Sequence, residues 1–239
     1  SATCVVNSTI SLPRVNIEDV SLICPGQVSS CAGGTLPGYE VHTYQTTTTL
    51  AGTCPDWVFS YSSCCRYSTI TNSQNPGSSS IYFESKLNNS SGACNDSPQF
   101  LSPLLFYACI NQPYNISHSV IELDGDSVVY RLAEPLSAAT IPIAYTAPYT
   151  LNYPFSTVTT SVSFDTTNGQ LSFTPDIGQI GLFDIIAAEY RNGVLVGEVR
   201  RAGVLNVINC GTNQPVSIDE VITVNDQGSP VSQGLSTEF

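Results

Sequence analysis

The sequence predicts an all-β fold cross-linked by disulfide bonds, and three observations indicate it. The chain contains many short runs of β-favouring residues at roughly even spacing, and no run of helical length with a helical period. The stretch from Phe183 to Val199 reads as a β-hairpin around Arg191-Asn192-Gly193, because Asn-Gly accepts the positive φ angles of a tight turn. Nine cysteines in 239 residues complete the pattern, since cystines can cross-link short strands and loops.

The strand candidates group into two tandem β-sandwich domains of the immunoglobulin-like or cadherin-like kind. We place a cysteine-rich first domain at residues 1–111 and the second domain at residues 112–211. Within the second domain, the turn from Asp165 to Gly169 predicts a further hairpin. Residues 212–239 are too short for a domain, and their valines and isoleucines predict a tail with one or two strands.

Composition excludes some classes of partner. A net charge of -12 with only seven Lys and Arg argues against nucleic acid, because a phosphate binder needs clustered basic residues. Charged residues make up 11% of the chain, against about 25% in a typical soluble domain. No run approaches the roughly 18 apolar residues of a membrane span. With the cysteines, these features predict an extracellular or cell-surface protein, and the chain reads as a processed or excised piece of something exported.

Cysteine positions predict two disulfide bonds directly. Cys24 and Cys31 bracket a loop that is short enough for a local bond. Cys109 and Cys210 stand at the two ends of the second domain. A bond between them would tie its first strand to its last.

The double cysteine Cys64-Cys65 follows a predicted strand. Since adjacent strand residues point to opposite faces, we expect these two thiols to reach different partners, and Cys54 and Cys94 are available in either order. The odd number of cysteines leaves Cys4 as the unpaired candidate. A zinc site is not expected, because the sequence has no Cys-x-x-Cys.

An acidic turn is the one candidate metal site. Glu122, Asp124 and Asp126 place three carboxylates around Gly125. Calcium takes six to eight oxygen ligands and commonly uses such clustered carboxylates. The alternative is a solvated acidic turn, and no other cofactor is expected.

Catalysis is not predicted. A hydrolase triad needs a nucleophile, a base and an orienting acid. The chain has two histidines as candidate bases, His42 and His118, but no serine lies in a Gly-x-Ser-x-Gly motif. A glycosidase needs only two carboxylates, for which Glu84, Glu134 and Glu189 are candidates. Carboxylates on strands are more often surface residues, so we predict no enzyme.

Aromatic residues raise a different possibility. Trp57, Tyr61, Tyr67 and Tyr82 could form a platform for a sugar ring, which would make the chain a carbohydrate-binding module. Alternating aromatics on a strand more often fill the core of a sandwich, and we expect that role here.

A series of short motifs follows along the chain: Asp56-Trp57-Val58-Phe59-Ser60-Tyr61, Cys64-Cys65-Arg66, Ile70-Thr71-Asn72, Leu87-Asn88-Asn89, Asn95-Asp96-Ser97-Pro98, Asp124-Gly125-Asp126-Ser127, Phe173-Thr174-Pro175 and Glu189-Tyr190-Arg191-Asn192-Gly193. In their order these motifs resemble those of the large modular surface proteins of Bacteroidota that often end in a gliding-motility-associated or type IX secretion sorting domain. The resemblance implies a structural or adhesive module of a cell-surface protein or extracellular fibre. It also implies O-glycosylation at Ser127 and Thr166, each of which follows an aspartate.

The same resemblance suggests how copies could assemble. Its members usually carry strands upstream of the position that matches Cys4, and the tail here has strand character without a domain. One hypothesis is that the tail of one copy completes an open sheet edge near Cys4 in the next, which would grow a fibre of neighbouring copies. The other is that the chain is a segment of a longer polypeptide. Glycans are the remaining candidate partners.

Overall fold

The computed structural model describes residues 8–21, 23, 26–36, 38–101, 106–211, 221–224 and 230–233. Over these residues the chain is all-β, and its helical elements are two short 3-10 turns, η1 (Ser30–Ala32) and η2 (Pro76–Ser78). The predicted fold class is therefore confirmed at the level of an all-β protein with disulfide bonds.

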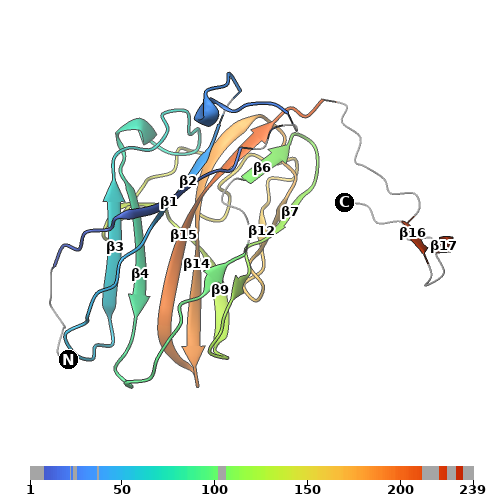
Figure 1. Cartoon of the computed structure of the whole chain (residues 1–239). Helices are drawn as coiled ribbons and strands as arrows, with labels where there is room; N and C mark the ends of the chain where they lie inside the picture. Colours follow the sequence, from blue (N-terminus) through green and yellow to red (C-terminus); the bar gives the residue numbers. More distant parts are fainter. Residues whose placement is uncertain are drawn as a thin grey trace. The chain divides into compact units, whose positions relative to one another are not determined.

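A six-stranded sheet dominates the larger part of the chain (Figure 1). Its strands lie in the order β3-β4-β15-β14-β9, and β6 pairs with β15 in parallel. The strands are β3 (Trp57–Ser63), β4 (Ile81–Leu87), β6 (Phe106–Cys109), β9 (Ser127–Ala133), β14 (Gln179–Arg191) and β15 (Val194–Ile208). The sheet thus joins segments from both halves of the sequence.

The β14–β15 hairpin confirms the turn that the sequence predicts. Asn192 and Gly193 have φ angles of 53° and 78°, the left-handed conformation that a two-residue turn requires. Both strands run further than the sequence suggests, because the charged residues that interrupt the apolar pattern have partners. Arg200 pairs with Asp184, and the guanidinium of Arg201 lies 5.0 Å from the centre of the Phe106 ring.

A three-stranded sheet supplies the second layer. It consists of β12 (Ser163–Phe164), β13 (Gln170–Phe173) and β7 (Tyr114–Ser117), in that order. The expected hairpin at Asp165 to Gly169 is present, since Ser163 pairs with Ser172 and Gly169 has a φ of 71°. The core joins the two sheets into a sandwich through Phe106, Ala108, Tyr130, Phe155, Leu171, Phe173, Phe183, Ile185, Ala187, Leu205 and Val207.

Four two-stranded sheets complete the described strands. They pair β1 (Arg14–Asp19) with β2 (Glu40–Tyr44), β5 (Gln99–Phe100) with β8 (Val120–Ile121), β10 (Leu136–Ala138) with β11 (Ile141–Pro142), and β16 (Val221–Val224) with β17 (Pro230–Gln233). The tail therefore holds two strands, which agrees with the expectation of one or two.

The division into compact units differs from the expected boundary at residue 111. One unit contains residues 1–57 and 87–95, and the other contains residues 58–86 and 96–239. Strands β3, β4 and β6 belong to the predicted first domain, yet they lie in the six-stranded sheet with β14 and β15. Long-range pairing therefore crosses the expected boundary, and the division into two tandem sandwiches is not confirmed.

The predicted disulfide between Cys109 and Cys210 is present, with the two Cα atoms 5.4 Å apart. Cys31 lies in η1 and is a free thiol, so the bond expected from it to Cys24 is not formed there. Cys24 itself, like the unpaired candidate Cys4, lies outside the described residues.

The expectation for the double cysteine is wrong. Cys64 and Cys65 are bonded to each other, and so neither is paired with Cys54 or Cys94. Strand β3 ends at Ser63, and the alternation of side chains that argued against this bond does not extend to residues beyond the strand. Cys54 is also disulfide-bonded.

Two buried ionisable groups give the sandwich opposing responses to pH. His118 is 0% exposed, contacts the rings of Phe106 and Phe183, and has no hydrogen bond to either ring nitrogen within the described structure. Burial, with a contribution from Arg201, lowers the pKa of His118 to about 4. Burial raises the pKa of Asp184 to about 6, although Arg200 opposes that shift.

The free energy of unfolding changes with pH in opposite directions for these two groups, because they bind protons differently in the folded and unfolded states. Between pH about 4 and 6.5 the unfolded state binds more protons at His118 than the folded state does, so the free energy of unfolding rises with pH. Between pH 3.8 and about 6 the folded state binds more protons at Asp184, and the free energy of unfolding falls as pH rises. The two contributions partly cancel in the native chain.

Replacing His118 by leucine should separate the contributions of His118 and Asp184, because Asp184 is retained in both the native chain and the variant. From pH 4 to pH 7 the free energy of unfolding of the native chain should rise by about 3 kcal/mol relative to His118→Leu, since each pKa unit is worth about 1.4 kcal/mol. Urea denaturation across this range measures the difference. His42→Leu, on the exposed strand β2, is the matched control and should not reproduce it. Parallel pH profiles for the native chain and His118→Leu would contradict the assignment.

Candidate functional site

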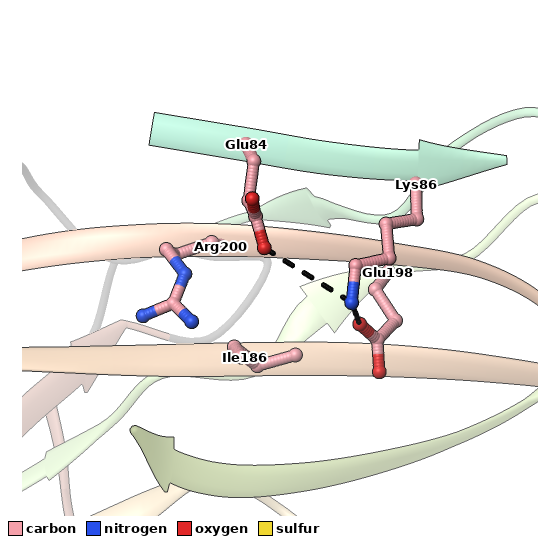
Figure 2. Close-up of a pocket in the computed structure, with 5 residues that line it drawn as sticks. All are labelled: Glu84, Lys86, Ile186, Glu198 and Arg200. Carbon is pink, nitrogen blue, oxygen red and sulfur yellow. Dashed lines mark ion pairs between the residues drawn. The ribbon is translucent and has the colours of Figure 1, made fainter. Parts of the chain in front are cut away.

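A shallow depression on one face of the six-stranded sheet gathers charged side chains from neighbouring strands. Figure 2 shows Glu84 and Lys86 on β4, Glu198 and Arg200 on β15, and Ile186 on β14. The Nζ atom of Lys86 lies 3.1 Å from Oε2 of Glu198 and 4.0 Å from Oε1 of Glu84. One ammonium group therefore lies between two carboxylates.

The surrounding charges extend this arrangement into a network. Arg131 of β9 donates to Glu198 at 2.6 Å, and Arg200 donates to the buried carboxylate of Asp184 at 2.9 Å. Burial alone would raise the pKa of Glu198, but hydrogen bonds from Arg131 and Lys86 hold it below its ordinary value. The network compensates its own charges and connects β4, β15, β14 and β9.

The three carboxylates considered for glycoside hydrolysis, those of Glu84, Glu134 and Glu189, lie in different surroundings. Glu84 lies in the depression, while Glu189 belongs to a separate acidic group with Glu122 and Asp126. Glu134 takes part through its backbone, whose carbonyl accepts a hydrogen bond from Arg200. Glu84 and Glu189 therefore do not face each other as an acid and nucleophile pair.

The acidic turn is built differently from the predicted calcium site. Carboxylate oxygens of Glu122, Asp126 and Glu189 lie within 4.8 Å of one another. Asp124 is directed instead toward Arg191, whose Nη2 lies 3.1 Å from its Oδ2. The two oxygens of Glu122 each accept a backbone N–H at 2.7 Å, from Asp124 and Asp126.

Arg191 supplies a positive charge at this turn. It binds Asp126 in a bidentate manner, with Nε 2.8 Å from Oδ1 and Nη2 2.7 Å from Oδ2. Hydrogen bonding to Asp126 raises the pKa of Arg191. Bidentate contacts of this kind are among the stronger hydrogen bonds of proteins. Arg191 therefore neutralises Asp124 and Asp126, while Glu122, Asp126 and Glu189 form the group that could hold a metal ion.

Sequence reasoning missed Arg191 and Glu189 as members of this group. They come from the end of β14, and the pairing of Tyr190 with Ser127 brings them beside the turn. Glu189 is fully buried and lies opposite Gly197, where a Cβ would collide with its Oε1 atom. Gly197 is the one sign in the sequence that a large side chain occupies the space beside this position on the neighbouring strand.

The aromatic residues of β3 only partly follow the expectation of a buried core. Trp57 and Tyr82 are buried at 9% and 6% exposure, but Tyr61 is 42% exposed and Tyr67 71%. Phe59, between Trp57 and Tyr61 on the strand, is 36% exposed. The reason is that β3 is the edge strand of its sheet, and the core cluster contains no residue of β3 or β4.

The two candidate glycosylation residues are exposed. Ser127 opens β9, and its hydroxyl donates to the carbonyl of Tyr190 at 3.2 Å. Thr166 lies in the turn between β12 and β13, where its carbonyl accepts a hydrogen bond from Tyr130. Modification at either residue stays a prediction.

The chain matches no protein-family model, no curated protein and no solved structure. Within the described residues, no helix has the length and apolar character needed to cross a membrane. Support for a function therefore has to come from the arrangement of the residues themselves.

The acidic turn gives a direct test of whether Arg191 takes the place of a metal ion. We expect the melting temperature of the native chain to be the same in millimolar calcium chloride and in chelator. In Arg191→Gln, oxygens of Asp124 and Asp126 lose their internal partner, and calcium should raise the melting temperature because it binds only the folded state. Differential scanning calorimetry measures both. A lower melting temperature of the native chain in chelator would instead establish the calcium site that the sequence predicts.

Proposed function

We propose that this chain is a structural module of a bacterial surface fibre, which transmits tension and provides adhesive contacts without catalysing a reaction. The observation that carries the proposal is the disulfide between Cys109 and Cys210, at the end of the parallel pair of β6 and β15. The resemblance to surface proteins of Bacteroidota and the disulfide bonds support an extracellular location. The proposed role for the sandwich is that of an immunoglobulin-like or cadherin-like spacer.

The geometry of β6 and β15 suits a chain that is pulled at both ends. In the parallel register Phe106 pairs with Leu205, and Cys109 pairs with Ile208. When the disulfide is open, the chain enters β6 at its first residue and leaves β15 at its last, so tension loads the pair in shear and its hydrogen bonds resist together. The disulfide then connects the two strands covalently where they end.

Tension would bypass most of the sandwich. Cys109 and Cys210 are 101 residues apart in sequence, and a force that passes through their disulfide does not extend the residues between them. These residues include β7, β9, β13, β14 and all of β15, which together form most of the core. Strands β3 and β4 lie outside the closed loop and can be extended first.

Single-molecule force spectroscopy tests this role. With the disulfide intact, the extension on unfolding should exclude the loop, and reduction should add about 350 Å, because 101 residues extend by about 3.5 Å each. Cys109→Ser should show the added length without reductant, which separates this bond from the other cystines. Equal extensions before and after reduction would contradict the proposal.

A carbohydrate-binding module is the second candidate, and the exposed aromatic side chains of Phe59 and Tyr61 favour it. Exposed aromatic rings on a strand provide flat apolar surface on which a sugar can stack. A glycan array with the native chain and with Tyr61→Ala distinguishes the two functions. The structural role predicts no selective glycan binding by either protein. Selective binding that is lost in Tyr61→Ala would favour the second candidate.

A further inference from the structure

We propose that the edge of β3 accepts strand β16 from a second copy of this chain, so that copies join head to tail. This inference rests on the proposed fibre role and names its partner and its contact. The sequence alone suggested an acceptor edge near Cys4, which lies outside the described residues. The structure offers a different edge, at the end of the six-stranded sheet.

Strand β3 lacks the features that usually protect a sheet edge. It has β4 as its only neighbour among the described strands. It is seven residues long and contains no charged residue and no proline. Val58 is 50% exposed and Phe59 is 36% exposed. Natural edge strands are commonly short, charged, bulged or covered, because an open edge pairs readily with another chain.

The opposite edge of the sheet, β9, is protected. The backbone N–H of Tyr130 donates to the carbonyl of Thr166 at 2.8 Å, so the turn after β12 covers part of this edge. Arg131 adds a charge near its centre. The two edges are therefore unequal, and an added strand has one favoured place to bind.

The tail provides a strand that needs a partner. Among the described strands, β16 pairs only with β17, and each has four residues. A two-stranded hairpin of this size is at best marginally stable by itself in water. The β16 sequence, Val-Ile-Thr-Val, is uncharged like β3. Copies that each carry a net charge of -12 repel one another, so contact between two uncharged strands is the least costly arrangement.

The same arrangement would restrict assembly to a single head-to-tail contact between successive copies. When β16 pairs with β3, its partner β17 becomes the new outer edge. That strand begins with Pro230, which has no backbone N–H to donate, so further strand addition is disfavoured. Each copy then has one donor and one acceptor on different parts of the chain, and such a contact extends without closing unless the rotation forms a ring.

The test uses three variants of the full chain and measures mass by light scattering after size exclusion. Val58→Lys places a charge on the acceptor, and Thr223→Pro removes a backbone N–H from the donor. Each should be monomeric alone. Their equimolar mixture should give a complex of twice the monomer mass that grows no further, because one protein keeps the donor and the other keeps the acceptor. Val129→Lys, at a 48% exposed position on β9, is the matched control and should assemble like the native chain.

The outcomes separate this contact from the fibre role itself. A native chain that stays monomeric at every concentration overturns both. Assembly of the native chain together with normal assembly of Val58→Lys, or a mixture that stays monomeric, overturns the β3–β16 contact alone. If Val58→Lys shows a loss of folded structure by circular dichroism, Phe59→Lys tests the same edge and the same outcomes apply.

Discussion

The register of the β14–β15 hairpin determines which face of the sheet each neighbouring side chain occupies. The turn at Asn192 and Gly193 pairs Tyr190 with Leu195, the register then shifts between Tyr190 and Glu189, and the shifted pairing continues to Gln179 and Val207. Because side chains alternate along a strand, a slip of one residue would exchange the two faces. Asp184 would then enter the apolar core that Phe183 and its neighbours form.

The face opposite the core is stabilised by paired charges. Glu198 on β15 holds Lys86 of β4 on one side and Arg131 of β9 on the other, and Asp184 holds Arg200. Removing Arg200 would be costly, because the fully buried carboxylate of Asp184 would stay in a medium of low polarity without its partner. The network therefore favours a single arrangement of these strands. It does not extend to β3, the strand beside β4, which contains no charged residue.

Local sequence patterns predicted the features that depend on neighbouring residues. The Asn192-Gly193 turn, the hairpin near Gly169 and the Cys109–Cys210 bond were predictable from turn chemistry and from the ends of the strand pattern. The tandem domains are not confirmed, and the pairing of β6 with β15, which joins residues about a hundred positions apart, had no local signal in the sequence. Cys64 and Cys65 were misassigned because strand geometry was extended past Ser63.

The candidate site shows the same limit. The carboxylates of the acidic turn are adjacent in sequence and were identified, whereas Arg191, which neutralises two of them, arrives through the pairing of β14 with β9. The charged depression joins β4 to β15 and could not be assembled from the sequence alone. Exposure of Phe59 and Tyr61 likewise depends on β3 being the last strand of its sheet.

We propose that this sandwich is a unit of a linear assembly. Negative-stain electron microscopy of the purified chain over a range of concentrations tests it most directly. Copies should appear one after another in unbranched rows that lengthen as concentration rises. Isolated particles of one size at every concentration would contradict it.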